Sequence, residues 1–459
     1  MTPSKFAALA LAISSVSAVA QAEEASQDFF PISLKTVSAQ SEATGFLEGQ
    51  SLAGTTRNWF SNEDQKRDGA FRYRKSDGSI ATKSSRDTWV QGTILNYSSG
   101  FTQGTVGIAT EVAAYNVVAL QQGRARTAAP NNRTLGDSNG NVVGQWSKLG
   151  LANIKARVSN TVFTAGRMNM DTPMVATIGN RALPSSFEGF NVTSEEFDNL
   201  TFQAAGFDRV SPRTEQGLSK FRSEYGDLGT ETDNVVLAGV GYKPFKSLTT
   251  SLYASRVKDF WNQYYFGAVH EWGDSNVFGL TTGLNYYKTV DTGQKKMGNI
   301  DNDTYSLSLT GTHKAHSLTL AYQQVNGNEY FDYLHETNGI FLANSLFSDF
   351  NGPNEKSAQI AYGLNMAEYG VPGLKFNVYT ARGWGIDGTH YRDTAYAVNN
   401  QDGEHHYEYG IGTTYTLQSG PLKSTSVRAT YSTHRASENQ ADGNLNELRI
   451  VTTIPFTIL

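Results

Sequence analysis

The residues of this sequence best suited to chemistry are basic side chains that stand singly between apolar neighbours. They are Lys155 and Arg157, which share one parity, and Lys375, Arg428 and Arg449. Alternate residues of an extended strand share a face, so these cations lie opposite the apolar side chains. Arginine binds a carboxylate through two parallel hydrogen bonds, and several such sites in a row could pass small anions along. Each cation could equally pair with an acidic residue and brace the fold. For one residue the two interpretations stay open, whereas for the set a selectivity role is favoured.

Other chemistries find little support in the sequence. The absence of cysteine excludes disulfides, thiolate metal sites and a cysteine nucleophile. His405 and His406 are adjacent, so they would point to opposite faces of a strand, and His434 stands alone in its neighbourhood. No pair of acidic residues suggests acid–base catalysis. We therefore expect no enzyme, metal or cofactor, and the formal net charge of −5 gives no reason to expect a nucleic-acid partner.

The segments that hold the cations belong to a chain-wide pattern of period two. Residues 305–312 place mainly apolar side chains on one parity and Ser or Thr on the other, and 317–323 repeat the pattern after a short polar link. Similar alternation occurs in 149–158, 248–255, 360–365, 426–432 and 449–456. Period two indicates strands, and the first two segments predict an antiparallel hairpin. The 23 Tyr, 24 Phe and 44 Gly also favour β-structure.

The first 22 residues have the features of a secretory signal peptide. Lys5 precedes an apolar stretch at 6–19, and the small-x-small site at 20–22 predicts a mature chain that starts at Glu23. No later run of 18 apolar residues occurs, which excludes a helical membrane protein. We predict a signal peptide at 1–22 and a single domain at 23–459.

A soluble β-sandwich would alternate in the same way, but two features favour a membrane barrel. The polar parity carries small and charged residues, as a water-filled lumen needs. Short links such as 98–100 alternate with long polar stretches such as 124–146 and 384–405, as turns and loops do on the two rims of a barrel. We therefore predict an all-β transmembrane antiparallel β-barrel of roughly 16 to 18 strands, each about 10 residues long, in a Gram-negative outer membrane.

Several segments resemble the OprD family of substrate-specific outer-membrane porins. Residues 339–357, GIFLANSLFSDFNGPNEKS, resemble the family's long constriction loop. Residues 181–197 resemble its inward-folded third loop, and 57–60, 369–374, 385–389, 417–421 and the C-terminal tail resemble other parts. The resemblance implies a barrel of about 18 strands with infolded loops, monomeric or loosely trimeric. A basic ladder would face an acidic or electron-rich pocket across a narrow eyelet, and the substrates would be small carboxylates.

Position by position, the resemblance adds residues to the candidate site. It assigns Arg57, Arg181, Arg428 and Arg449 to the ladder, and Tyr333, Ser345 and Asp349 to the constriction pocket. With Lys155, Arg157 and Lys375 from parity, and with Arg382, these residues form the full prediction. Thr430 stands where some members have a second arginine, and Phe347 where some have tyrosine. Strict parity would turn Arg382 outward, so a bulge is needed to bring it into the lumen. The sequence around it, ARGWGIDG at 381–388, resembles more closely the branch of the family that prefers organic acids.

The expected function is facilitated diffusion of small carboxylates, including organic and aromatic acids, through an outer-membrane channel. Two alternatives stay open, a porin specific for basic amino acids or peptides and a general diffusion pore. A barrel that displays long loops to a partner is a further possibility. The expected partners are the substrates, outer-membrane lipid and lipopolysaccharide. An unpaired carboxylate is costly in a confined site, so Asp349 should be hydrogen-bonded when no substrate is bound.

Overall fold

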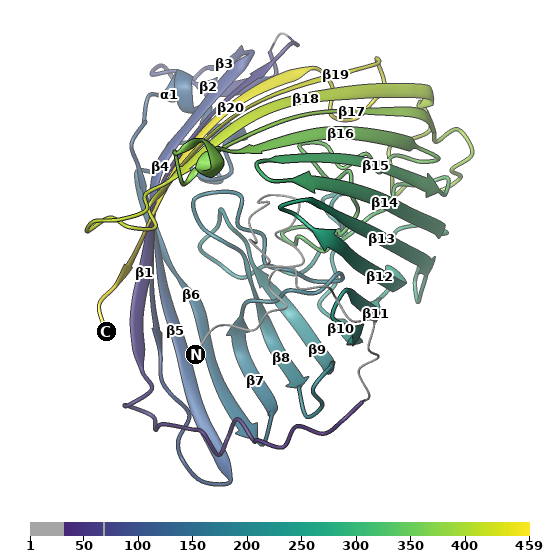
Figure 1. Ribbon diagram of the computed structural model, residues 1–459. Helices are drawn as coiled ribbons and strands as arrows, with labels where there is room; N and C mark the ends of the chain where they lie inside the picture. Colours follow the sequence, from purple (N-terminus) through teal and green to yellow (C-terminus); the bar gives the residue numbers. More distant parts are fainter. Residues whose placement is uncertain (1–31, 68) are drawn as a thin grey trace.

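Alternating strands close into one barrel (Figure 1). The computed structural model describes residues 32–67 and 69–459, and the predicted signal peptide lies outside them. The barrel strands are β1 (Ser51–Gln65), β4 (Ser85–Ser98), β5 (Val106–Ala119), β6 (Gln145–Val158), β7 (Thr161–Met168), β8 (Ser186–Ser194), β9 (Leu200–Ser211), β10 (Val235–Phe245), β11 (Leu248–Val257), β12 (Trp261–Asp274), β13 (Phe278–Asp291), β14 (Asp301–His313), β15 (His316–Asn326), β16 (Lys356–Asn365), β17 (Leu374–Asp387), β18 (Asp402–Thr416), β19 (Ser426–Ala436) and β20 (Leu445–Thr457).

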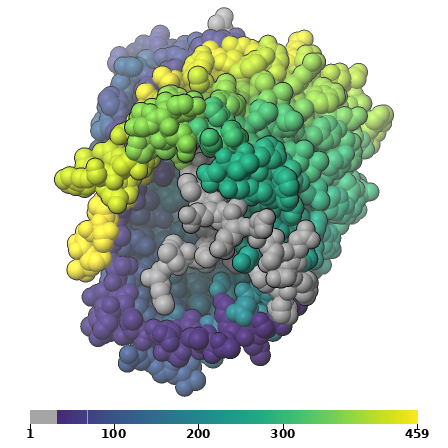
Figure 2. Space-filling model, in the orientation of Figure 1, coloured from purple at the N-terminus to yellow at the C-terminus, as the bar shows by residue number. Residues whose placement is uncertain are grey.

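These 18 strands pair antiparallel in chain order, and β20 returns to pair with β1, which closes the ring. The predicted hairpin is confirmed, with Leu309 opposite Leu320 in β14 and β15. Strand lengths run from 8 to 15 residues, so several exceed the predicted length. Figure 2 shows the molecule hollowed at one end, between the N-terminal strands in purple and blue and the strands in green.

The two rims differ as predicted. Connections such as 159–160, 246–247 and 314–315 form one rim, and long loops at 66–84, 120–144, 169–185, 212–234, 327–355 and 388–401 form the other. Long loops face the cell exterior in such barrels. One boundary was wrong, because the predicted third-loop stretch at 181–197 leaves the loop after residue 185 and continues as β8. The short elements are β2 (Phe71–Arg74), β3 (Ile80–Lys83), α1 (Arg124–Thr127), η1 (Ala129–Asn131) and η2 (Met366–Tyr369). Within the described residues, no helix has the length and apolar character that crossing a membrane requires.

The apolar parity of the strands faces outward and the polar parity faces the lumen. In β14, Leu307 and Leu309 expose 42% and 39% of their surface, whereas Ser306 is 0% exposed. The hydroxyl of Ser306 accepts the backbone N–H of Ala343 in loop 327–355. The side chain of Gln323 in β15 likewise accepts the N–H of Asn344. The polar face therefore serves as a hydrogen-bonding surface that holds the long loop inside the barrel.

The principal hydrophobic core lies within the barrel, between the infolded loops and the inner wall. It joins loop residues such as Phe221, Phe331 and Leu342 to wall residues such as Tyr287. The Tyr287 hydroxyl donates to the carbonyl of Pro173 at 3.1 Å and accepts from the N–H of Phe341. Loops 169–185 and 327–355 are thus fixed to β13, and they narrow the lumen.

Candidate functional site: a cationic wall and an infolded loop pocket

Four arginines gather around Trp59 on the inner face where β19, β20 and β1 adjoin. We call Arg57, Arg181, Arg428 and Arg449 the arginine wall. The guanidinium groups of Arg181 and Arg449 lie 5.9 and 5.7 Å from the Trp59 ring centroid. Arg428 stands opposite Val451, which stands opposite Trp59, so these residues share the inner face. Its charge is close enough to those of Arg57 and Arg449 to repel them. The structure therefore brings together the four arginines that the family resemblance assigned to the ladder.

Arg57 holds a loop against this wall. Its guanidinium donates to the carbonyls of Gly179 and Arg181 at 2.8 and 2.7 Å, and the Trp59 indole donates to the carbonyl of Asn180. Loop 169–185 is thereby fixed to β1, which places Arg181 beside the wall. The hydrogen bonds of Arg57 give it a bracing role within the predicted ladder.

Three other predicted cations have partners of their own. Lys155 forms an ion pair with Glu111 at 3.1 Å, and Arg449 pairs with Glu447 at 2.8 Å. Arg157 donates to the side chain of Gln40 at 2.9 Å and stacks on the ring of Phe101. All three occupy inner-face positions, as parity predicted, and for them the bracing interpretation describes the observed contacts.

Arg428 and Arg181 differ from these cations. In the part of the chain that the structure describes, neither has a carboxylate within ion-pair distance, and Arg428 is exposed on the inner face. Lys375 lies on the same face of β17, since it stands opposite Thr414, which stands opposite Arg428. The wall therefore retains positive charge that its own acidic residues do not neutralise.

Arg382 does not belong to the ladder, and this part of the prediction is wrong. It is exposed, while its neighbour Ala381 is buried on the inner face opposite Glu408. The irregularity in β17 begins only after Trp384, so no bulge precedes Arg382 to turn it inward. Strict alternation therefore places the Arg382 side chain on the outer surface.

The three predicted pocket residues lie together, because two of them donate hydrogen bonds to the carboxylate of the third. The Ser345 hydroxyl donates to Asp349 Oδ1 at 2.6 Å, and the Tyr333 hydroxyl donates to Oδ2 at 2.6 Å. Tyr225, from loop 212–234, donates to the same Oδ2 at 2.7 Å and stacks on Tyr330. Asp349 is hydrogen-bonded to the protein itself, as expected. We call Tyr225, Tyr333, Ser345 and Asp349 the Asp349 pocket.

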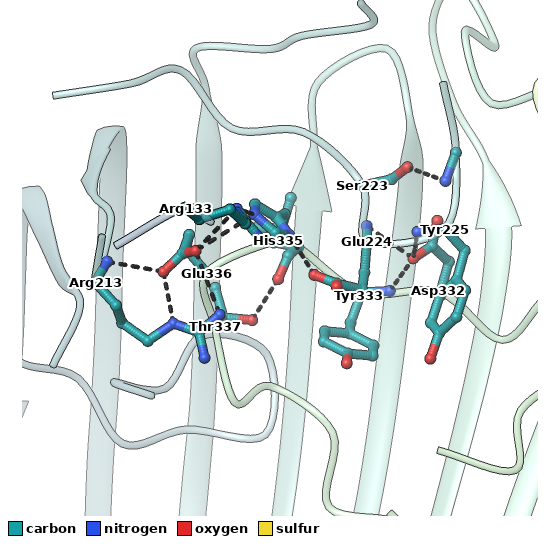
Figure 3. Close-up of polar contacts among 12 residues, drawn as sticks. Arg133, Arg213, Ser223, Glu224, Tyr225, Asp332, Tyr333, His335, Glu336 and Thr337 are labelled. Atoms are coloured by element: carbon teal, nitrogen blue, oxygen red, sulfur yellow. Dashed lines mark hydrogen bonds and ion pairs between the residues drawn. The ribbon is translucent and has the colours of Figure 1, made fainter. Parts of the chain in front are cut away.

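A second cluster, absent from the sequence prediction, joins the loops to one another (Figure 3). Glu336 is buried and accepts the backbone N–H and the Nε of Arg213 at 2.9 and 2.8 Å. Arg133 approaches Glu336 at 3.2 Å and also contacts His335. Arg213 donates in addition to Asn180. We call Arg133, Arg213, His335 and Glu336 the Glu336 cluster.

The Glu336 cluster ties four loops together. Its side chains and Asn180 come from 120–144, 169–185, 212–234 and 327–355. Removing one partner of a buried ion pair leaves an uncompensated charge, which costs about 3–5 kcal/mol. The cluster is therefore an electrostatic link that helps to keep the four loops folded into the lumen.

The pKa values of three loop carboxyl groups, those of Glu336, Asp332 and Asp349, differ because their surroundings differ. Burial alone would raise the pKa of Glu336, but hydrogen bonds from His335 and Arg213 hold that pKa well below its usual range. Asp332 has hydrogen bonds but no cation, and burial raises its pKa to about 7. Burial also raises the pKa of Asp349, although its three hydroxyl donors oppose the shift.

Loop 327–355 is also anchored to the wall on its other side. Glu408 in β18 accepts the backbone N–H groups of Phe347 and Ser348 at 3.1 and 2.9 Å. Phe347, which stands where some relatives have tyrosine, is exposed at this anchor. The backbone N–H groups at these two positions fix the loop to β18. This anchor therefore does not depend on whether residue 347 is phenylalanine or tyrosine.

His434 is not alone, contrary to the expectation from sequence. Its Nε2 lies 2.7 Å from Nδ1 of His406, whose Nε2 lies 2.6 Å from Glu355. Together with Asp442 these histidines bring three possible metal ligands together, the one such group among the described residues. Two nitrogen ligands of a tetrahedral zinc ion lie about 3.3 Å apart, so the observed separation fits a hydrogen bond better. Phe350 stacks on His406, and the group braces the constriction loop.

Comparison with known proteins agrees with this architecture. The family described as outer membrane porin, OprD family, matches residues 44–458. The chain belongs to the OprD family. It is therefore an outer-membrane porin, and its closed 18-stranded barrel is the fold of that family.

Individual members of the family show how close the likeness is. The chain is 36% identical to Porin D of Pseudomonas aeruginosa over 458 residues, which covers 96% of this chain and 99% of that protein. The crystal structure of P. aeruginosa OccD3 (OpdP) has 49% identity and a TM-score of 0.81, with 94% of this chain and 95% of that one covered. P. aeruginosa OpdK, solved with vanillate, has 26% identity and a TM-score of 0.78, with coverages of 90% and 100%.

Sequence reasoning did not find the loop residues that complete the site. Arg133, Arg213 and Glu336 lie in loops, where no period-two pattern reports on direction. Tyr225 lies 124 residues from its partner Asp349 along the chain. Of these residues only Arg133 lies in a stretch that the sequence marked as long and polar, 124–146, and nothing in that stretch could have named its partner.

Proposed function

We propose that this porin passes small carboxylates by diffusion, without a chemical step, along the arginine wall. The observation that carries the proposal is that Arg428 and Arg181 face the lumen side without a carboxylate of their own. A guanidinium in a confined site of low dielectric binds a carboxylate more strongly than it does in bulk water. At Arg428, a substrate carboxylate can thus bind the guanidinium as the carboxylate of Glu447 does at Arg449.

The groups that already pair with the wall arginines favour passage of a substrate anion over tight binding of it. Arg449 already shares its charge with Glu447, and Arg57 with two carbonyl groups, so both bind an added anion more weakly than Arg428 does. Several weak sites allow release as well as entry. The ladder therefore favours flux over tight binding.

We infer that the Asp349 pocket binds the end of the substrate that lies opposite its carboxylate. Its carboxylate and two phenols would suit a cationic or hydrogen-bonding group, which keeps a porin for basic amino acids as the second candidate function. Vanillate was bound in the OpdK structure, which supports an aromatic carboxylate here.

Liposome swelling tests the proposal against a general diffusion pore. Porin in liposomes should admit small organic acids faster than neutral sugars of matched size. Equal rates would favour the general pore and contradict the proposal. The same purified porin, sized in detergent, would show a monomer or a loose trimer, and we propose the monomer as the transport unit because the lumen and both site regions lie within one chain.

A further inference from the structure

Strands β16 to β19 lie side by side in the barrel (Figure 1). Near the long-loop rim, these four strands carry basic side chains on the outer surface. Lys356, Arg382, His405 and Arg435 all lie on the outward parity, because their strand neighbours Ser357, Ala381, His406 and His434 are buried on the inner face. Arg382 stands opposite Tyr407, and Tyr407 stands opposite Arg435. Adjacent strands lie about 4.8 Å apart, so the Cα atoms of Arg382 and Arg435 are about 10 Å apart, with Tyr407 between them. We call Lys356, Arg382 and Arg435 the outer basic patch.

The patch lies at the level of an aromatic girdle. On β18, outward-facing Tyr407 and Tyr409 lie toward the long-loop rim and outward-facing Tyr415 toward the short-turn rim, with exposed Ile411 between them. Aromatic girdles mark the two membrane interfaces of such barrels. Arg382, opposite Tyr407, therefore lies at the outer interface, where lipid headgroups begin.

Two cations of the patch lack partners. Within the described residues, the side chains of Lys356 and Arg382 have no hydrogen bond, ion pair or ring contact. Arg435 donates only to neutral groups, the carbonyls of His434 and Leu445 and the side chain of Asn446. Glu404 and Glu408 of β18 are close along the chain, but both side chains are buried on the inner face, and Asp387 and Asp402 lie beyond the patch at the strand ends.

Another outward cation of the barrel is neutralised by its own strand neighbours. Lys288 in β13 forms ion pairs with Asp301 at 2.5 Å and Asp303 at 2.7 Å. The outer basic patch has no such neutralisation. A positive cluster at an interface attracts anionic lipid headgroups, and arginine binds phosphate in a bidentate manner.

We propose that the outer basic patch binds a phosphate group of lipopolysaccharide in the outer leaflet. Lys356 and Arg382 contact the phosphate, and the rings of Tyr407 and Tyr409 lie along the acyl–headgroup boundary. The site explains why the chain keeps Arg382 on the outer surface without an acidic neighbour. It is independent of the transport path in the lumen.

The test measures binding of fluorescent lipid A carrying both phosphates to the purified, folded porin. Lys356→Gln with Arg382→Gln should weaken binding by about tenfold, because charge-assisted phosphate contacts are lost. Arg256→Gln is the matched control, since Arg256 is also exposed on the outer surface but donates to Asn262 in a different sector. The control should bind lipid A as the wild type does. Heat-modifiable mobility on gels confirms that each variant keeps its barrel.

Three results would overturn the proposal. One is a double variant that loses no more affinity than Arg256→Gln. Another is equal binding of dephosphorylated lipid A by the wild-type porin, which would show that acyl chains alone determine the interaction. Equal loss for lipid A and for phosphatidylglycerol vesicles would also contradict it, because the patch would then recognise any anionic lipid.

Discussion

Arginines in two regions of this porin meet opposite conditions. In the Glu336 cluster, Arg213 is buried and its guanidinium faces a carboxylate that is held ionised. In the arginine wall, Arg428 is exposed to the lumen and lacks a carboxylate partner among the described residues. The same side chain therefore fastens loops in one region and remains available to a solute in the other. Pairing, and not the presence of arginine, separates structure from transport.

The largest effect should follow from breaking the loop cluster. Glu336→Gln leaves Arg213 buried without its counter-charge, which should destabilise the loops by about 3–5 kcal/mol. Loops that leave the lumen widen it, so single-channel conductance should rise for all ions and substrate discrimination should fall. Glu215→Gln, at an exposed loop glutamate, is the control. Unchanged conductance in Glu336→Gln would show that the cluster does not hold the loops.

Removing the charge of Arg428 should slow carboxylate transport without widening the channel. Arg428→Gln should slow carboxylate uptake by roughly tenfold, since a hydrogen bond to a charged group is worth about 1.5–3 kcal/mol. Neutral sugars should enter at the wild-type rate in the same liposomes. Arg256→Gln on the outer surface should leave both rates unchanged. An equal decline for sugars and carboxylates would mean that Arg428 shapes the pore instead of binding the anion.

The Asp349 pocket should give a smaller and more selective effect. Asp349→Asn should reduce uptake of carboxylates whose far end is cationic by several-fold and leave those with a neutral or aromatic far end nearly unchanged. Asp227→Asn, at an exposed site in loop 212–234, is the control. If Asp349 only holds its loop, the variant will change conductance for all ions and keep the ranking of substrates.

The smallest effect is a pH dependence in the same pocket. Burial raises the pKa of Asp349, so this carboxyl becomes neutral at a higher pH than an exposed one, whose pKa is about 3.9. Acidification should therefore reduce preference for a cationic far end before exposed carboxylates titrate. Uptake ratios measured across pH in the wild type and in Asp349→Asn test this. A ratio that changes equally in both would assign the titration to another group.

The fold followed from sequence because strand direction has a simple period. Alternation located Lys155, Lys375, Arg428 and Arg449 on the inner face from their apolar neighbours alone. Arg382 obeys the same rule, since parity indicated an outward side chain and its place in the predicted ladder required a bulge that β17 does not have before it. The prediction of Arg382 as a ladder residue was therefore wrong, and strict parity was right.

The loop contacts could not be predicted in this way. Tyr225 and Asp349 meet because two loops fold into the lumen, and His406 meets His434 because their strands pair in one particular register. Loop direction has no period, and register depends on the whole barrel. The resemblance to relatives supplied Tyr333, Ser345 and Asp349, but it did not supply the residues that hold them in place.

The most direct test of the arginine wall compares a carboxylate with its own amide. Benzoate and benzamide have nearly the same size, so the ratio of their fluxes in liposomes reports on charge recognition alone. We predict that benzoate enters faster than benzamide through the wild-type porin, and that the ratio falls toward one in Arg428→Gln while Arg256→Gln keeps the wild-type value. An unchanged ratio in Arg428→Gln would contradict the claim that the unpaired wall arginine selects the carboxylate.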